Sequence, residues 1–241
     1  MIKTEDNVVH EVSAQARGGK GRKLGMILGA DEPYFLTSTG KVLLHPEENM
    51  IKTLPGEHED LLFIITKQGI GKYVKFEKTG RIISLKEGDE VVDAVFTSGE
   101  EDIIVATEDG QALLIKGSEI PTLGETAQGV HIIKGGEVAG CDIVRKYLVP
   151  VSRAGLGKRV KASEFVPHHR YGMGIKIIGE GKLAGIVSVD DGDDIIVCSE
   201  KGYVLKTPAD QIPLQGRTSK GCILMKLELG DYLAKLTREE S

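Results

Sequence analysis

An apolar run that ends in Thr or Ser, with a Gly three residues later, occurs five times along this 241-residue chain. The five segments are "YFLTSTGKVLL" (34–44), "LLFIITKQGIGKYVKF" (61–76), "IIVATEDGQALLI" (103–115), "YLVPVSRAGLGKRV" (147–160) and "IIVCSEKGYVLK" (195–206). Two apolar runs joined by a short polar turn with Gly predict a β-hairpin. The turn glycines are Gly40, Gly69, Gly110, Gly155 and Gly202. Their last three intervals are 41, 45 and 47 residues, so the chain is predicted to be an array of similar units.

A second motif, a polar loop with Gly followed by another strand, alternates with the hairpins. It reads "QARGGKGRKLGMIL" (15–28), "KTGRIISL" (78–85), "AQGVHIIK" (127–134), "RYGMGIKII" (170–178) and "TSKGCILMKL" (218–227). With one further strand, each unit holds four strands in about 45 residues, the size of a propeller blade. We expect about five four-stranded blades, in preference to six, with an N-terminal strand completing the C-terminal blade and closing the ring. Residues 46–60 fit the repeat least well, because the first unit is shortened there.

Composition favours one all-β domain over residues 1–241. The 31 glycines, the absence of Trp and 5% aromatic residues predict many tight turns around a core of Val, Ile and Leu. No sustained helical periodicity is present. Cys141, Cys198 and Cys222 are widely spaced and are expected to be core residues in a reducing compartment. No leader or spanning segment is evident, so a cytoplasmic protein without membrane contact is expected.

Positive charge is concentrated although the chain carries −5 overall. Residues 13–25 hold four basic side chains and four glycines without an acid, which suits phosphate binding by cations and exposed backbone N–H groups. Residues 145–176 carry +7, so the remainder carries −12. This segregation predicts a track for a polyanion, and nothing in the sequence predicts the reading of bases.

The heptapeptide "QARGGKG" (15–21) resembles the box motif of the C-terminal domain of DNA gyrase A, Gln-Arg-Arg-Gly-Gly-Lys/Arg-Gly. Six positions agree, and Ala16 departs from the pattern. The phrases "DIIVATEDG", "SEIP", "GRTSKG" and "LGD" extend the resemblance along most of residues 8–236. The resemblance implies a β-pinwheel, a propeller-like disc whose blades exchange strands.

The same resemblance implies a function. The basic outer rim would bind double-stranded DNA without sequence preference and wrap it, supporting supercoiling by gyrase, a type II topoisomerase. The implied partners are the breakage-reunion domain of gyrase A and, through it, gyrase B. The strand-breaking tyrosine of the family lies in another domain, so this chain is expected to be no enzyme by itself and to need no cofactor or metal.

The candidate DNA-binding residues fall into two groups. The first is the box loop and the residues that follow it: Gln15, Arg17, Gly18, Gly19, Lys20, Gly21, Arg22 and Lys23. The second is expected along the rim: Lys72, Lys75, Arg81, Arg153, Lys158, Arg159, Lys161, Arg170, Arg217 and Lys220. Binding through phosphates predicts a log K that falls by about 0.9 per contact for each decade of salt.

Two other functions stay open on the sequence. A protein-interaction propeller would scaffold partners and would be insensitive to loss of charge at residues 15–23. A disc that binds DNA without wrapping it, like that of topoisomerase IV, is favoured by Ala16 and by the smaller number of blades. Three further patterns are discounted: the faint phosphate loop at 154–163 lacks the required spacing, His168-His169 lacks a nearby ligand, and "SVDDGDD" (188–194) lacks a terminal Glu.

Overall fold

The predicted hairpin turns are the repeated local structure of the molecule. The computed structural model describes residues 2–4, 9–10, 17–20, 22–23, 27–29, 34–43, 50–54, 61–75 and 79–239. All five turn glycines have φ between 72° and 85°, the left-handed region that glycine enters at no steric cost. In each turn the Gly N–H donates to the carbonyl of the Thr or Ser three residues earlier. The hydroxyl of that Thr or Ser accepts a second bond from the residue after the Gly, at 3.1–3.2 Å.

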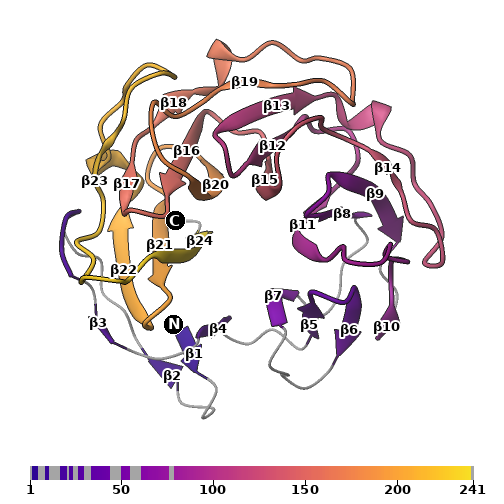
Figure 1. The fold of residues 1–241 in the computed structure, drawn as a ribbon, viewed down its shortest axis with the longest axis horizontal. Helices are drawn as coiled ribbons and strands as arrows, with labels where there is room; N and C mark the ends of the chain where they lie inside the picture. The colour runs from indigo at the N-terminus through magenta and orange to yellow at the C-terminus, as the bar shows by residue number, and fades with distance from the viewer. Residues whose placement is uncertain are drawn as a thin grey trace.

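Five antiparallel sheets form the blades of a ring (Figure 1). Their innermost strands are β7 (Met50–Leu54), β11 (Val91–Thr97), β15 (Val138–Ile143), β20 (Leu183–Val189) and β24 (Leu233–Glu239). The next strands outward are β5 (Tyr34–Thr37), β8 (Leu61–Thr66), β12 (Ile103–Thr107), β16 (Tyr147–Ser152) and β21 (Asp194–Ser199). We number the blades 1 to 5 in this order. The prediction of an all-β, five-bladed propeller is confirmed.

The outer half of each blade begins with the second hairpin strand. These strands are β6 (Lys41–Leu43), β9 (Ile70–Lys75), β13 (Gln111–Ile115), β17 (Leu156–Gly157) continued by β18 (Val160–Lys161), and β22 (Tyr203–Pro208). The outermost strands are β10 (Gly80–Arg81), β14 (Val130–His131), β19 (Ile175–Lys176), β23 (Cys222–Ile223) and β3 (Arg22–Lys23). Three short 3-10 helices, η1 (Gly117–Glu119), η2 (Ala162–Glu164) and η3 (Ala209–Gln211), follow the second hairpin strands of blades 3, 4 and 5.

Each outermost strand is donated by the following unit. Strand β14 follows the hairpin of blade 3 in the chain but pairs with β9 of blade 2, and β19 and β23 make the same step back. The residue after the donated strand donates its N–H to the carbonyl of the earlier turn glycine, as Ile132 does to Gly69 at 2.8 Å and Ile177 to Gly110 at 2.9 Å. Blades are therefore joined by backbone hydrogen bonds as well as by side-chain packing.

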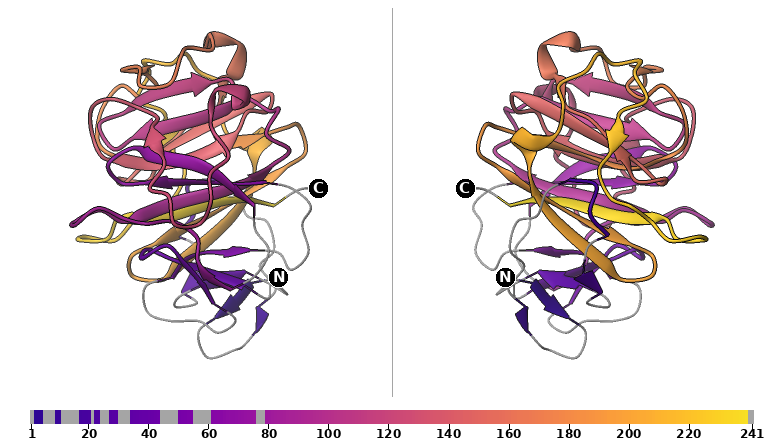
Figure 2. Two further views of the ribbon diagram at one scale, coloured as in Figure 1. Left: turned by 90° about the vertical axis from the view of Figure 1, so that its right-hand side faces the viewer. Right: turned by 90° about the vertical axis from the view of Figure 1, so that its left-hand side faces the viewer.

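The last blade receives its outermost strand from the N-terminus, which closes the ring as the sequence predicted. Lys23 pairs with Tyr203 and Arg22 with Val204. A smaller three-stranded sheet, β2 (Val9–His10), β1 (Ile2–Thr4) and β4 (Ile27–Gly29), lies between blade 5 and blade 1 (Figure 1). The edge-on views show these indigo strands at one end of the molecule, next to the orange strands of blade 5 (Figure 2).

The core lies between neighbouring blades. Phe63 and Tyr73 of blade 2 pack with Val105 and Leu113 of blade 3, and the two aromatic rings meet edge to face with centroids 5.8 Å apart. Equivalent clusters join blades 1 and 2, 3 and 4, and 4 and 5. Of the cysteines, Cys141 is buried, as expected, whereas Cys198 and Cys222 are half-buried and the expectation that all three are core residues is wrong for them.

Charged side chains on the innermost strands add a second set of blade-to-blade contacts. Lys52 of blade 1 donates to Asp93 of blade 2 at 2.9 Å, and the other oxygen of Asp93 accepts from the Cys141 N–H of blade 3 at 3.0 Å. Asp142 of blade 3 accepts from the Ser188 N–H of blade 4 at 2.8 Å. Burial opposes the charge of Lys52, but Asp93 outweighs it and raises the pKa of Lys52. These bonds tie four blades together around the axis.

We predict that Gly110→Ala lowers the free energy of unfolding by more than the strained backbone alone requires. Gly110 has φ +85°, and a Cβ there would lie 2.7 Å from the Ile178 side chain of the donated segment. The left-handed backbone costs about 1–2 kcal/mol for a non-glycine residue, and the clash adds to this.

Urea unfolding of both variants checks this, with Gly181→Ala as the matched control. Gly181 has the same φ of +85° but nothing within 4 Å of the added Cβ. Equal losses in the two variants would contradict a coupling between the turn and the donated strand.

Candidate nucleic-acid interface

The box loop lies at the outer edge of the ring, where blade 5 is completed. The Gly18 N–H donates to the Leu224 carbonyl at 2.5 Å, and the Lys226 N–H donates to the Gly19 carbonyl at 2.8 Å. Gly18 has φ +78°, which explains a glycine at this position. These bonds hold the loop against the segment that follows β23.

The box side chains that the structure describes are exposed. Arg17 donates one guanidinium bond to the Ile223 carbonyl at 3.5 Å, and Lys20 is exposed. The backbone of Arg22 and Lys23 forms β3. Gln15 and Gly21 lie outside the described residues.

Other predicted cations lie on or next to the outer strands. Lys75, Arg81, Lys161, Arg170 and Lys220 are exposed, and Arg217 is half-buried. Lys220 pairs with Glu180 at 2.6 Å, and Arg217 lies 3.8 Å from Glu164. Ion pairs as exposed as these contribute little to stability, so a phosphate can compete for the cations.

Two predicted rim residues, Lys72 and Lys158, are instead buried. Each side chain is 0% exposed, and each ammonium group donates to backbone carbonyls of the following unit. Lys72 donates to Gly124 at 2.6 Å and to Ala127 at 2.9 Å. Burial lowers the pKa of both lysines to about 8. The prediction that these two side chains face solvent on the rim is therefore wrong, because the loop of the following unit covers each lysine and supplies the carbonyl partners.

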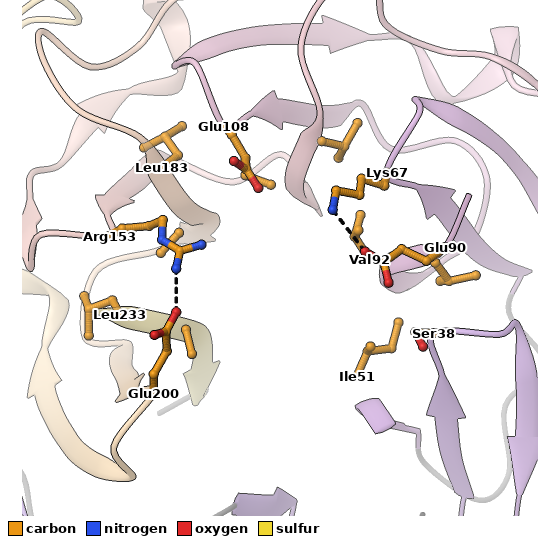
Figure 3. Close-up of a pocket in the computed structure, with 15 residues that line it drawn as sticks. Ser38, Ile51, Lys67, Glu90, Val92, Glu108, Arg153, Leu183, Glu200 and Leu233 are labelled. Carbon is orange, nitrogen blue, oxygen red and sulfur yellow. Dashed lines mark hydrogen bonds and ion pairs between the residues drawn. The ribbon is translucent and has the colours of Figure 1, made fainter. Parts of the chain in front are cut away.

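Arg153 lies at the mouth of the central channel and not on the rim (Figure 3). A cavity of about 290 Å³ is lined there by the residue that follows the Thr or Ser of each of the five turns: Ser38, Lys67, Glu108, Arg153 and Glu200. Arg153 pairs with Glu200 at 2.5 Å, Lys67 with Glu90 at 3.2 Å, and Lys182 with Glu108 at 3.1 Å. Opposite charges are thus paired around this mouth, which does not favour a polyanion.

The +7 segment is partly neutralised by acids that follow it in the chain, two in the turn after β20 and one in η3 of the next unit. Arg145 pairs with Asp190 at 3.2 Å and Arg159 with Asp210 at 2.6 Å, and Lys146 pairs with Asp191. Arg159, predicted on the rim, is only slightly exposed and also donates to the Ile212 carbonyl at 2.9 Å. The charge track expected from residues 145–176 is therefore reduced to its exposed members.

Two exposed lysines that the sequence analysis left out lie beside the predicted ones. Lys134 lies 4.3 Å from the centre of the Tyr171 ring, next to Arg170, and Lys176 accepts an Arg217 guanidinium bond at its carbonyl, 3.2 Å away. The sequence signal that could have identified them is their position, since Lys134 follows a donated strand and Lys176 lies within one. We define the rim surface as the exposed or half-exposed cations on the donated strands, on β18 and on the loops beside them: Arg17, Lys20, Arg81, Lys134, Lys161, Arg170, Lys176, Arg217 and Lys220.

Neither the paired histidines nor any other described group forms a metal centre. His169 lies 2.9 Å from the Glu119 carboxylate, and among the described residues no cluster of three or more His, Cys, Asp or Glu side chains is placed to hold a metal ion. None of the helices in the described ranges is long or apolar enough to cross a membrane.

The family model of the DNA gyrase C-terminal domain, beta-propeller, matches residues 60–78, 79–98, 101–145, 146–196 and 193–238. The chain belongs to this family. The first two segments together cover the unit that begins with the hairpin of blade 2, and the other three cover those of blades 3, 4 and 5, so the repeat found in the sequence matches the family's segments over blades 2 to 5.

Curated relatives are components of an enzyme. The chain is 32% identical to DNA gyrase A of Aminobacterium colombiense over 94% of its own length, and 36% identical to that of Kosmotoga olearia over 83%. It spans 34% and 28% of those proteins, about a third of their length. The chain is thus homologous to the C-terminal part of gyrase A.

Two solved structures share the fold at low sequence identity. A DNA gyrase A C-terminal domain superposes with a TM-score of 0.79 at 20% identity, covering 94% of this chain and 92% of that one. A C-terminal domain of DNA topoisomerase IV gives 0.76 at 22% identity, covering 86% and 78%. At these identities the match shows the propeller fold alone.

The lowered pKa of Lys158 predicts a specific pH dependence of stability. Its folded pKa of about 8 lies below the ordinary value of about 10.4, so the unfolded chain binds this proton more tightly. The free energy of unfolding should therefore rise with pH between 8 and 10.4 through Lys158, and this contribution is absent below pH 8.

Urea unfolding from pH 7 to 10.5 tests this on the wild type, Lys158→Leu and the exposed control Lys161→Leu. The wild type should gain stability relative to Lys158→Leu as the pH rises through this window, while Lys161→Leu should run parallel to the wild type. A constant difference between the wild type and Lys158→Leu would show that Lys158 titrates normally.

Proposed function

We propose that this chain binds double-stranded DNA through phosphate contacts on the rim surface and wraps it, in support of supercoiling by gyrase. The observation that carries the proposal is the position of the box loop. Its Arg17 and Lys20 side chains are exposed at the outer edge, on the segment that leads into the ring-closing strand β3. DNA held there would contact the rim surface of several neighbouring blades.

The arrangement of cations supports binding without base recognition. The cations of the rim surface lie on outer strands of two residues and on the loops beside them, and no recognition helix is present among the described residues. Lys and Arg on such loops reach phosphates, which carry no sequence information. Because acids partly neutralise these cations, we expect binding that is weak at physiological salt and steeply salt-dependent.

The proposed partners follow from the relatives' names. The curated relatives are DNA gyrase A proteins, and this chain corresponds to about a third of their length. We propose that the chain acts beside the breakage-reunion domain of gyrase A and, through it, with gyrase B. The catalytic tyrosine would lie in that other domain, so this chain would direct the path of the DNA and would not cleave it.

We predict that the purified chain shifts the linking number of nicked plasmid closed by ligase at low salt, and that Arg17→Ala/Lys20→Ala abolishes the shift. The two substitutions remove phosphate contacts where the wrapped DNA is held, and each lost contact lowers the affinity about eightfold at 0.1 M salt. Gel electrophoresis of the topoisomers measures the shift, and gel retardation of linear DNA measures binding.

The matched control is Lys86→Ala/Lys182→Ala, which removes the same charge from exposed turns before the innermost strands β11 and β20. Its topoisomers should match those of the wild type. Retardation without a topological shift would leave a disc that binds DNA but does not wrap it. Absence of retardation at low salt would overturn the proposal in favour of a protein-interaction scaffold.

A further inference from the structure

Two loops of the rim follow the same backbone path around a buried lysine. We call residues 122–129 the Lys72 loop and residues 214–221 the Lys158 loop. Each loop directly follows a Pro, and the carbonyl of that Pro accepts a hydrogen bond from the N–H of the residue after the lysine. Each ends in a glycine with positive φ, 105° at Gly129 and 87° at Gly221. The two loops are therefore equivalent positions of the repeat.

At each loop, the ammonium group of the lysine donates hydrogen bonds to several loop carbonyls, which therefore point toward it. Lys158 Nζ donates to the carbonyls of Gly216 at 2.8 Å, Arg217 at 2.6 Å and Ser219 at 2.8 Å. Lys72 Nζ contacts the equivalent carbonyls of its own loop, those of Gly124, Glu125 and Ala127, at 2.6–3.5 Å. The carbonyl oxygens of both loops thus converge on a buried ammonium group.

The peptide N–H groups must then point the other way. In a trans peptide the N–H of one residue is directed opposite to the carbonyl of the residue before it. In the Lys158 loop these are the N–H groups of Arg217, Thr218 and Lys220, and none of them donates a hydrogen bond within the described part of the chain. The outer side is open, because a Cβ added at Gly216 would meet nothing within 4 Å.

We propose that the Lys158 loop is a phosphate-binding site for the DNA backbone, in which Lys158 acts as a positioning residue that turns three backbone N–H groups outward. Successive N–H groups that point to one side bind anions. Arg217 and Lys220, which are half-buried and exposed respectively, come from the same loop and supply the charge. This inference rests on the proposed DNA binding and assigns it a site outside the box loop.

The Lys72 loop is a natural comparison within the same molecule. It has the same cage, by which we mean the loop carbonyls around the buried ammonium group, and it has the equivalent N–H groups, those of Glu125, Thr126 and Gln128. However, Glu125 stands where the other loop has Arg217, and Gln128 stands where it has Lys220. A carboxylate beside the N–H groups repels a phosphate. The Lys72 loop should therefore have the backbone of the site without its affinity.

Substitution of the positioning lysine tests the role of the cage. Leucine occupies the equivalent position after the turn glycine in other blades, as Leu113 and Leu205, so Lys158→Leu and Lys72→Leu are compatible with the fold. Lys158→Leu should lower the affinity for a 40-base-pair duplex about eightfold at 0.1 M salt and reduce the salt slope of log K by about 0.9. Lys72→Leu, which loses an equivalent cage, should bind as the wild type does.

A gain of binding tests the site without disturbing the cage. Glu125→Arg/Gln128→Lys gives the Lys72 loop the outer side chains of the Lys158 loop and should raise the affinity and the salt slope by one contact, about eightfold and about 0.9. The same variant combined with Lys72→Leu should gain less, because added charge without the outward N–H groups is an ordinary surface contact.

Amide NMR shifts identify the contact directly, with inorganic phosphate and the duplex as probes. The amides of Arg217, Thr218 and Lys220 should shift in the wild type and stay unchanged in Lys158→Leu, while those of Glu125, Thr126 and Gln128 should not move. If the wild type binds DNA and the two variants, Lys158→Leu and Lys72→Leu, lose the same amount of affinity or none, this inference is overturned and the proposed function stays intact. A wild type that does not bind DNA at all would overturn the proposed function.

Discussion

The rest of the structure depends on the hydrogen bond between a turn glycine and the strand donated by the next unit. Gly40, Gly69, Gly110 and Gly155 each accept a bond at 2.9 Å or shorter from the first residue after a donated segment. A sheet made from one unit alone would lack its outermost strand and would expose an edge. Each blade is therefore completed by its successor, and the last blade can only be completed by the N-terminus.

This exchange also determines what lies on the rim. The loops that lead into donated strands must cross from one blade to the previous one, so they run along the outside of the ring. Residues 17–20 of the box loop, the Lys72 loop, residues 166–174 and the Lys158 loop occupy this position at their junctions. Residues that contact a large external ligand can thus vary in these loops while the hairpins and the core between blades stay the same.

The repeat and the turns could be predicted from the sequence because each depends on residues close together in the chain. The ring closure pairs Arg22 and Lys23 with Val204 and Tyr203, and it could be predicted because the repeat leaves the last blade without an outermost strand. The five Thr or Ser hydroxyls and the five glycines form their bonds within four residues. The burial of Lys72 and Lys158 could not be predicted from the sequence, because their carbonyl partners lie 52–61 residues away in the chain. The same holds for Arg159, whose acidic partner Asp210 belongs to the next unit.

A net charge of −5 does not by itself oppose binding of DNA at the rim. Glu90, Glu108, Glu137 and Glu200 lie at or beside the channel mouth, where Lys67, Lys182 and Arg153 pair with them. Three steps between neighbouring strands separate the innermost from the outermost strand, about 14 Å. Since charges are screened over about 8–10 Å at physiological salt, a phosphate on the rim interacts mainly with the cations beside it. The distribution of charge across the blade, more than its sum, decides which face of the ring can hold a polyanion.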